Sequence, residues 1–109
     1  MRLLLDTHVL LWALDDPARL GRKTRSLIER SEALVSVASL WEISIKAGLG
    51  KLKIEPRHVF DAIEPSGFDL LPVQATHALE VISLGAVHGD PLDRLLVAQA
   101  MSERITLLT

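Results

Sequence analysis

The stretch Arg2-Leu3-Leu4-Leu5-Asp6 decides the predicted fold. Three consecutive leucines followed by an acid predict a short strand over Arg2–Asp6 that is covered on both faces, because unbroken apolar character is typical of parallel sheets. Asp6 then stands at the carboxyl end of this strand, the edge where ligand sites of open α/β sheets gather. A second interpretation, with equal weight, is that Asp6 is the N-cap of a helix that begins near Thr7.

Further strands and helices alternate along the chain. Strands are expected at 33–37, 68–71 and 105–108, and helices at 9–14, 19–31, 39–47, 56–65, 76–84 and 88–103. In the helix at 76–84, we expect Ala78, Leu79 and Ile82 to face the core. The alternation predicts an α/β fold with a parallel sheet. A length of 109 residues predicts a single domain, 1–109.

Composition narrows the class of protein. The chain has no cysteine, which excludes a disulfide framework and a cysteine zinc site and fits a reducing cytoplasm. Asp6 and His8 interrupt the first apolar run, so no signal peptide is expected. No apolar run approaches the length of a membrane span. We therefore expect a soluble, cytoplasmic protein without a membrane partner.

Charge is unevenly distributed, although the formal net charge is only −2. Residues 19–57 hold nine of the twelve Lys and Arg but four of the fourteen Asp and Glu. This split predicts one basic region and one acidic region. A basic region beside clustered carboxylates suits the binding of a phosphate backbone near metal ions. The alternative is that these Arg and Lys residues simply lie on ordinary solvated helix faces.

The segment 88–100, HGDPLDRLLVAQA, predicts a turn followed by an apolar, deeply buried helix. Asp90 before Pro91 is a good N-cap with proline at the first helical position, which explains Asp90 without any further role. Asp93 falls in the first turn, where the helix dipole favours negative charge. Because the cap is already taken, Asp93 is the better candidate for a functional acid.

Glu42 is the third acid of interest. Ser39-Leu40-Trp41-Glu42 fits a capping box at the start of the helix at 39–47, which is one explanation of Glu42. The other places Glu42 on the first turn of a helix that follows a strand. Asp6, Glu42 and Asp93 would then share one edge of a parallel sheet. Their repulsion would favour a divalent cation, and Mg²⁺ often takes only one or two direct carboxylates.

Three segments together resemble PIN-domain proteins of the VapC toxin type. These are Leu3-Leu4-Leu5-Asp6-Thr7-His8, Ser39-Leu40-Trp41-Glu42-Ile43 and the run 88–96. The resemblance covers essentially the whole chain and implies a PIN-like three-layer α/β/α fold with a central parallel sheet of about four strands. It also implies a ribonuclease that uses Mg²⁺ or Mn²⁺.

By this resemblance, Asp6, Glu42 and Asp93 correspond to the metal-binding, catalytic acids. Asp90 is an auxiliary acid and Thr7 lies beside the site. Toxins of this type pair with a small antitoxin, form homodimers and cut structured RNA such as tRNA, leaving 5′-phosphate and 3′-hydroxyl ends. Members usually continue past a threonine like Thr109 to a fourth acid. We therefore expect the C-terminal end of the domain to be cut short here, which would weaken a second metal position most.

The leading hypothesis is thus a metal-dependent endoribonuclease, the toxin of a toxin–antitoxin pair. His8 and His88 are candidate general acids, with solvent-facing or capping roles as the alternative. The alternative function is a non-cleaving or truncated PIN module that binds an antitoxin or RNA. An aspartate-nucleophile phosphotransferase is disfavoured, because such motifs place a second acid where His8 stands. The candidates for RNA backbone contacts are basic residues: Arg19, Arg22, Lys23, Arg25, Lys46 and Lys51.

Overall fold

The computed structural model describes residues 1–85 and 89–109. In chain order the elements are β1 (Arg2–Leu5), α1 (Thr7–Asp15), η1 (Pro17–Leu20), α2 (Arg22–Glu29), β2 (Glu32–Ser36), α3 (Val37–Gly48), α4 (Pro56–Ile63), β3 (Asp69–Leu71), α5 (Ala75–Glu80), η2 (Val81–Leu84), α6 (Pro91–Glu103) and β4 (Thr106–Leu108). The predicted turn residue and candidate acid His88 lies outside the described residues.

The strands form one parallel sheet in the order β3-β2-β1-β4, which confirms the predicted parallel sheet. β1 lies between β2 and β4, so that Leu4 pairs with Leu34 on one side and with Leu107 on the other. The pairing continues past the strand, since the Asp6 amide donates to the Leu108 carbonyl at 3.1 Å. Asp6 is therefore fixed at the carboxyl edge of the sheet.

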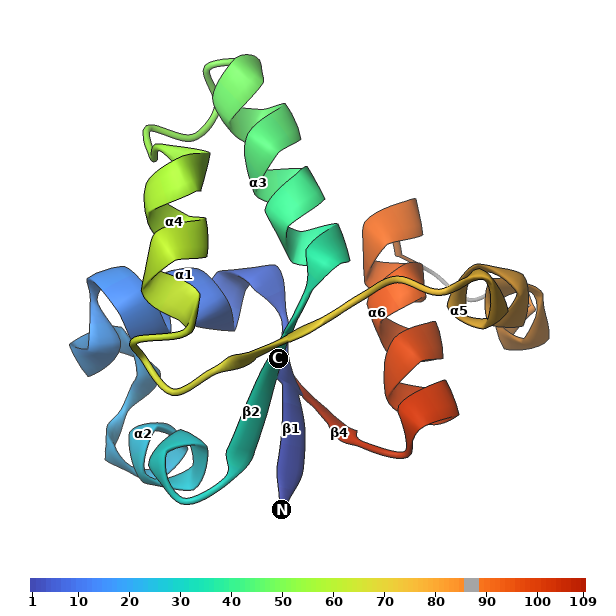
Figure 1. The fold of residues 1–109 in the computed structure, drawn as a ribbon, viewed down its shortest axis with the longest axis horizontal. Helices are drawn as coiled ribbons and strands as arrows, with labels where there is room; N and C mark the ends of the chain where they lie inside the picture. Colours follow the sequence, from blue (N-terminus) through green and yellow to red (C-terminus); the bar gives the residue numbers. More distant parts are fainter. Residues whose placement is uncertain (86–88) are drawn as a thin grey trace.

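Both faces of β1 are covered, as its three leucines predict. Leu3 and Leu5 enter a core with side chains of α1, α2, α3 and α4, whereas Leu4 enters a second core with Leu96 and Ala100 of α6. Adjacent strand residues point to opposite faces, so consecutive leucines supply both cores. Figure 1 shows α1 and α2 on one side of the sheet and α5 and α6 on the other, the predicted α/β/α arrangement.

Two predicted helix boundaries are wrong. The helix expected at 19–31 is divided into η1 and α2 at Gly21, whose φ of +82° is outside the helical region. The helix expected at 39–47 begins at Val37, and Ser36 caps it by accepting from the Ala38 amide at 3.0 Å. The predicted Ser39–Glu42 capping box is therefore not formed, and Glu42 lies in the second turn, where its side chain is available for other contacts.

The inward face predicted for the helix at 76–84 is also wrong. Leu79 and Ile82 are 73% and 83% exposed, and Ala78 is exposed as well. The α-helix ends at Glu80 and the chain continues as the tighter turn η2, so a single helical period does not describe the segment. The buried residue of α5 is His77, because both of its ring nitrogens have polar partners.

α6 is less deeply buried than its sequence predicts. Leu96 is buried, whereas Leu92, Leu95 and Val97 are half-buried. The N-terminal residues Pro91 and Asp93 are exposed at the carboxyl edge of the sheet. In residues 1–85 and 89–109, no helix combines the length and the apolar character needed to cross a membrane.

The end of α6 offers a test of the backbone geometry. Arg104, the C-cap, has a left-handed φ of +56°, the only non-glycine with positive φ in the described chain. Replacing it by glycine should raise the free energy of unfolding by about 0.5 kcal/mol, since relief of the left-handed strain outweighs the added entropy of the unfolded chain. Urea unfolding measures this change.

The matched control is Arg30→Gly. Arg30 is the C-cap of α2 and has an ordinary φ of −99°, so the same substitution should lower the stability. Equal losses in both variants would contradict the assigned conformation of Arg104.

Candidate metal centre

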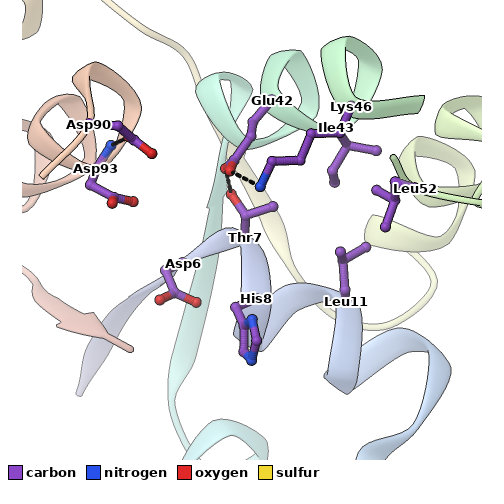
Figure 2. A pocket seen from close by; sticks show the side chains of 10 residues that line it. All are labelled: Asp6, Thr7, His8, Leu11, Glu42, Ile43, Lys46, Leu52, Asp90 and Asp93. Carbon is purple, nitrogen blue, oxygen red and sulfur yellow. Dashed lines mark hydrogen bonds and ion pairs between the residues drawn. The ribbon is translucent and has the colours of Figure 1, made fainter. Parts of the chain in front are cut away.

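A pocket of about 360 Å³ opens at the carboxyl edge of the sheet. Its polar lining comes from three places in the chain: Asp6, Thr7 and His8 at the junction of β1 and α1, Glu42 and Lys46 on α3, and Asp90 and Asp93 at the start of α6. Figure 2 shows these side chains around one space. The structure thus brings the three predicted acids, the auxiliary Asp90 and Thr7 to a single pocket.

Asp6 and Asp90 each cap a helix at the pocket. The Asp6 Oδ1 atom accepts from the Val9 amide at 2.8 Å, and Asp90 Oδ1 accepts from the Asp93 amide at 2.8 Å. Both capping predictions are confirmed. Each bond uses one carboxylate oxygen, and each residue also lines the pocket, so capping and a role toward a ligand are compatible in both cases.

Glu42 is buried and held on both of its oxygens. Its Oε1 accepts from the Thr7 hydroxyl at 2.5 Å, and its Oε2 lies 2.8 Å from Lys46 Nζ. The Thr7 hydroxyl also lies 3.0 Å from the hydroxyl of the buried Ser39. Thr7 therefore connects α1 to α3 across the pocket, which gives it a clear structural reason to stand beside the acids.

The clustering of carboxylates in the pocket disfavours the charged form of Asp93. Although Asp93 is exposed overall, partial loss of hydration at the pocket raises the pKa of its carboxyl above the ordinary 3.8. The nearby charges of Asp90, Glu42 and Asp6 raise this pKa further, and Lys46 opposes them. Within the described residues, neither Asp93 carboxylate oxygen accepts a hydrogen bond. A partly desolvated carboxylate facing three others is a group that a cation would stabilise.

Residues 3–109 match the family model of the PIN domain. The chain belongs to the PIN domain family. The match spans both ends of the sheet and all the acids that line the pocket, so it confirms the resemblance predicted from the three segments. No match is found among curated proteins.

Solved structures support the same PIN fold. VapBC2 from Rickettsia felis, bound to a DNA fragment from its promoter, aligns with a TM-score of 0.71 at 19% identity, over 100% of this chain and 87% of that one. A toxin–antitoxin complex from Klebsiella pneumoniae aligns at 0.62 and 19%, over 97% and 83%. DNA-bound VapBC from Salmonella typhimurium aligns at 0.64 and 17%, over 96% and 83%.

The donors of this PIN pocket fit a hard divalent cation. Carboxylate oxygens are the ligands that Mg²⁺ and Mn²⁺ prefer, and the only basic side chain lining the pocket among described residues, apart from His8, is Lys46. The spacing is open, because no three acidic or histidine side chains in the described chain stand close enough to hold one ion together. Mg²⁺ keeps several waters, so water can bridge part of such a site.

The other basic candidates and His8 lie differently. Lys46 is the only RNA-contact candidate that lines the pocket, and Arg19 stacks on the Trp12 ring with its guanidinium carbon 4.6 Å from the ring centroid. Figure 1 places α2, which carries Arg22, Lys23 and Arg25, near the start of the strands. His8 is exposed and packs edge-on against Trp12, with ring centroids 4.1 Å apart.

Sequence reasoning missed a buried polar network that anchors α6. Ser36 Oγ donates to Gln99 Oε1 at 2.5 Å, and Gln99 Nε2 donates to the Pro72 carbonyl at 3.3 Å. His77 Nδ1 accepts from the Gln74 amide, so the proton on Nε2 points to Glu103, 2.8 Å away. The network joins β2, α5 and α6 and so fixes the helix that carries Asp90 and Asp93.

The raised pKa of Asp93 predicts a pH-dependent stability. A folded-state pKa above the unfolded value means that the native state binds the proton more tightly, so ionisation of Asp93 costs stability as pH rises through and above 3.8. Without divalent ions, Asp93→Asn should therefore raise the melting temperature at pH 7. The gain should shrink as pH falls toward 4.

Asp69→Asn is the control for this measurement, since Asp69 is an exposed acid on β3, outside the pocket. It should leave the melting temperature nearly unchanged at both pH values. A lower melting temperature for Asp93→Asn at pH 7 would contradict the repulsion argument.

Proposed function

We propose that this chain is a metal-dependent endoribonuclease and the toxin of a toxin–antitoxin pair. The observation that carries the proposal is the gathering of Asp6, Glu42, Asp90 and Asp93 in one pocket of a PIN domain. Family membership supports a hydrolase that acts on nucleic acid. We further infer that residues 1–109 form one PIN domain, in which these acids are the functional centre.

Asp6, Glu42 and Asp93 are the residues proposed to hold Mg²⁺ or Mn²⁺, directly or through water. A bound ion would supply an activated water and charge stabilisation for attack on a phosphodiester. Asp90 orients α6 through its cap on the Asp93 amide, and Thr7 orients Glu42 through its hydroxyl. The expected products carry 5′-phosphate and 3′-hydroxyl ends.

A cognate antitoxin is the proposed protein partner. The support comes from the three structural neighbours, which are toxin–antitoxin complexes by description. We also propose RNA as the substrate, tRNA or another structured RNA, and a cytoplasmic homodimer as the working state. Lys46 at the pocket and Arg19, Arg22, Lys23, Arg25 and Lys51 outside it remain the proposed backbone contacts.

The alternative is a PIN module that binds an antitoxin or RNA without cutting. The open spacing of the acids among the described residues favours this alternative. Retained partner binding, together with no metal binding, would identify it.

The nuclease proposal predicts metal-dependent cleavage of RNA by the purified chain. Asp6→Asn and Asp93→Asn should each lower the cleavage rate by more than about 100-fold, since loss of even an outer-shell metal partner commonly costs 10–100-fold. Gel analysis of a structured RNA with Mn²⁺ or Mg²⁺, and with EDTA as the metal-free control, measures this rate.

Asp69→Asn is again the matched control and should cut at the parent rate. Cleavage that persists in EDTA or in both pocket variants would contradict the assignment, because the activity would then arise elsewhere or from a contaminant.

A further inference from the structure

The acidic pocket contains a positive charge supplied by the chain itself. Lys46 follows Glu42 by one turn of α3, and its Nζ lies 2.8 Å from Glu42 Oε2. Figure 2 shows the ammonium group directed into the space between Glu42 and Thr7. Most such pairs lie on exposed helix faces and contribute little to stability. This pair instead lines the pocket together with Asp6, Asp90 and Asp93.

Both oxygens of Glu42 have a partner while this pair is formed. Thr7 donates to one oxygen and Lys46 occupies the other. The Glu42 side chain is 11% exposed, so water provides little alternative solvation. Each oxygen keeps a free lone pair, but a cation at Oε2 would meet the positive charge of Lys46 at close range. Of the two partners, Lys46 is therefore the one that a cation would repel and whose charge it would replace.

The remaining acids also act on Lys46. The Lys46 ammonium lines the pocket together with Asp6, Asp90 and Asp93, so it lies within the field of the same carboxylates that would hold a divalent ion. Its side chain is 51% exposed, so the group can move to solvent without opening the core.

We propose that Lys46 is an internal counter-ion of the metal-free pocket, which holds Glu42 until a divalent cation displaces it. This inference rests on the proposed metal site, and it adds that Lys46 competes with the metal ion for Glu42. Cation binding becomes an exchange of one positive charge for another. The displaced ammonium remains at the mouth of the pocket, where a substrate phosphate would meet it.

Mn²⁺ binding measured by titration calorimetry tests the exchange without any assay of activity. Lys46→Met keeps the length of the side chain and removes the charge. It should bind Mn²⁺ about two- to fivefold more tightly than the parent chain, the range expected for release from a partly exposed ion pair. Its melting temperature without metal should fall, because the carboxylates lose their counter-ion.

Lys23→Met is the matched control, as it makes the same change of net charge on α2, outside the pocket. Its Mn²⁺ affinity should equal that of the parent. Unchanged or weaker Mn²⁺ binding by Lys46→Met would overturn the proposal. Lys46 would then either not compete with the metal or favour its binding by positioning Glu42.

Repeating Lys46→Met in a Glu42→Gln background locates the effect. If Lys46 acts by holding Glu42, the gain in affinity should largely disappear there, whereas an equal gain would overturn the proposal and indicate a long-range charge effect. A parent chain that binds no Mn²⁺ would instead refute the proposed metal site itself. A parent that binds Mn²⁺ but cuts no RNA would refute the nuclease and leave the exchange standing.

Discussion

The position of β1 between β2 and β4 is the constraint on which the rest of the structure depends. Leu3, Leu4 and Leu5 are fully buried because helices cover both faces of this strand. Parallel pairing on both sides aligns the carboxyl ends of the strands, and the hydrogen bond from the Asp6 amide to Leu108 extends that alignment. The start of α1, the start of α3 and the pocket between them follow from it.

The acids of α6 need a second constraint, because the element described before α6 is η2 and not a strand of the sheet. The buried hydrogen bonds among Ser36, Gln99 and His77 provide it. Polar groups removed from water are costly unless paired, so a shift of α6 against β2 would cost stability by leaving members of this network unpaired. Side chains far from the pocket thus determine where Asp90 and Asp93 stand.

The sequence predicts the sheet and the acids for reasons that are local. An unbroken run of leucines indicates a strand buried on both faces, and Asp90-Pro91 specifies a helix start whatever surrounds it. Glu42 could not be interpreted correctly in the same way, because the end of β2 at Ser36 decides which residue caps α3. The pattern from Ser39 to Glu42 resembles a capping box, but α3 has already begun at Val37 with Ser36 as its cap.

Buried polar residues escaped prediction for a related reason. His77 and Gln99 are fully buried, yet their own segments do not mark them as core residues, because apart from the local bond from the Gln74 amide their partners are 22 to 63 residues away. The same holds for Leu79 and Ile82, which look like core residues but lie on the face of α5 and η2 that the network turns outward. Lys46 was predicted as an RNA contact; its i,i+4 spacing from Glu42 permits an ion pair on a helix, and the structure shows that pair inside the pocket.

The pocket itself combines favourable helix caps with unfavourable charge. Asp6 and Asp90 stabilise α1 and α6 by capping, whereas partial loss of hydration and three neighbouring carboxylates raise the pKa of Asp93 and so disfavour its charged form. Protein folds tolerate such local cost where it prepares a binding site. The central claim is therefore that a divalent cation relieves this repulsion.

Thermal unfolding with and without Mn²⁺ tests that claim most directly. A ligand that binds only the folded chain adds about 2.7 kcal/mol at 100 times its dissociation constant, which is readily visible as a higher melting temperature. The account predicts a rise for the parent chain that Asp93→Asn abolishes and Asp69→Asn preserves. No rise for the parent chain, or an equal rise in Asp93→Asn, would contradict it.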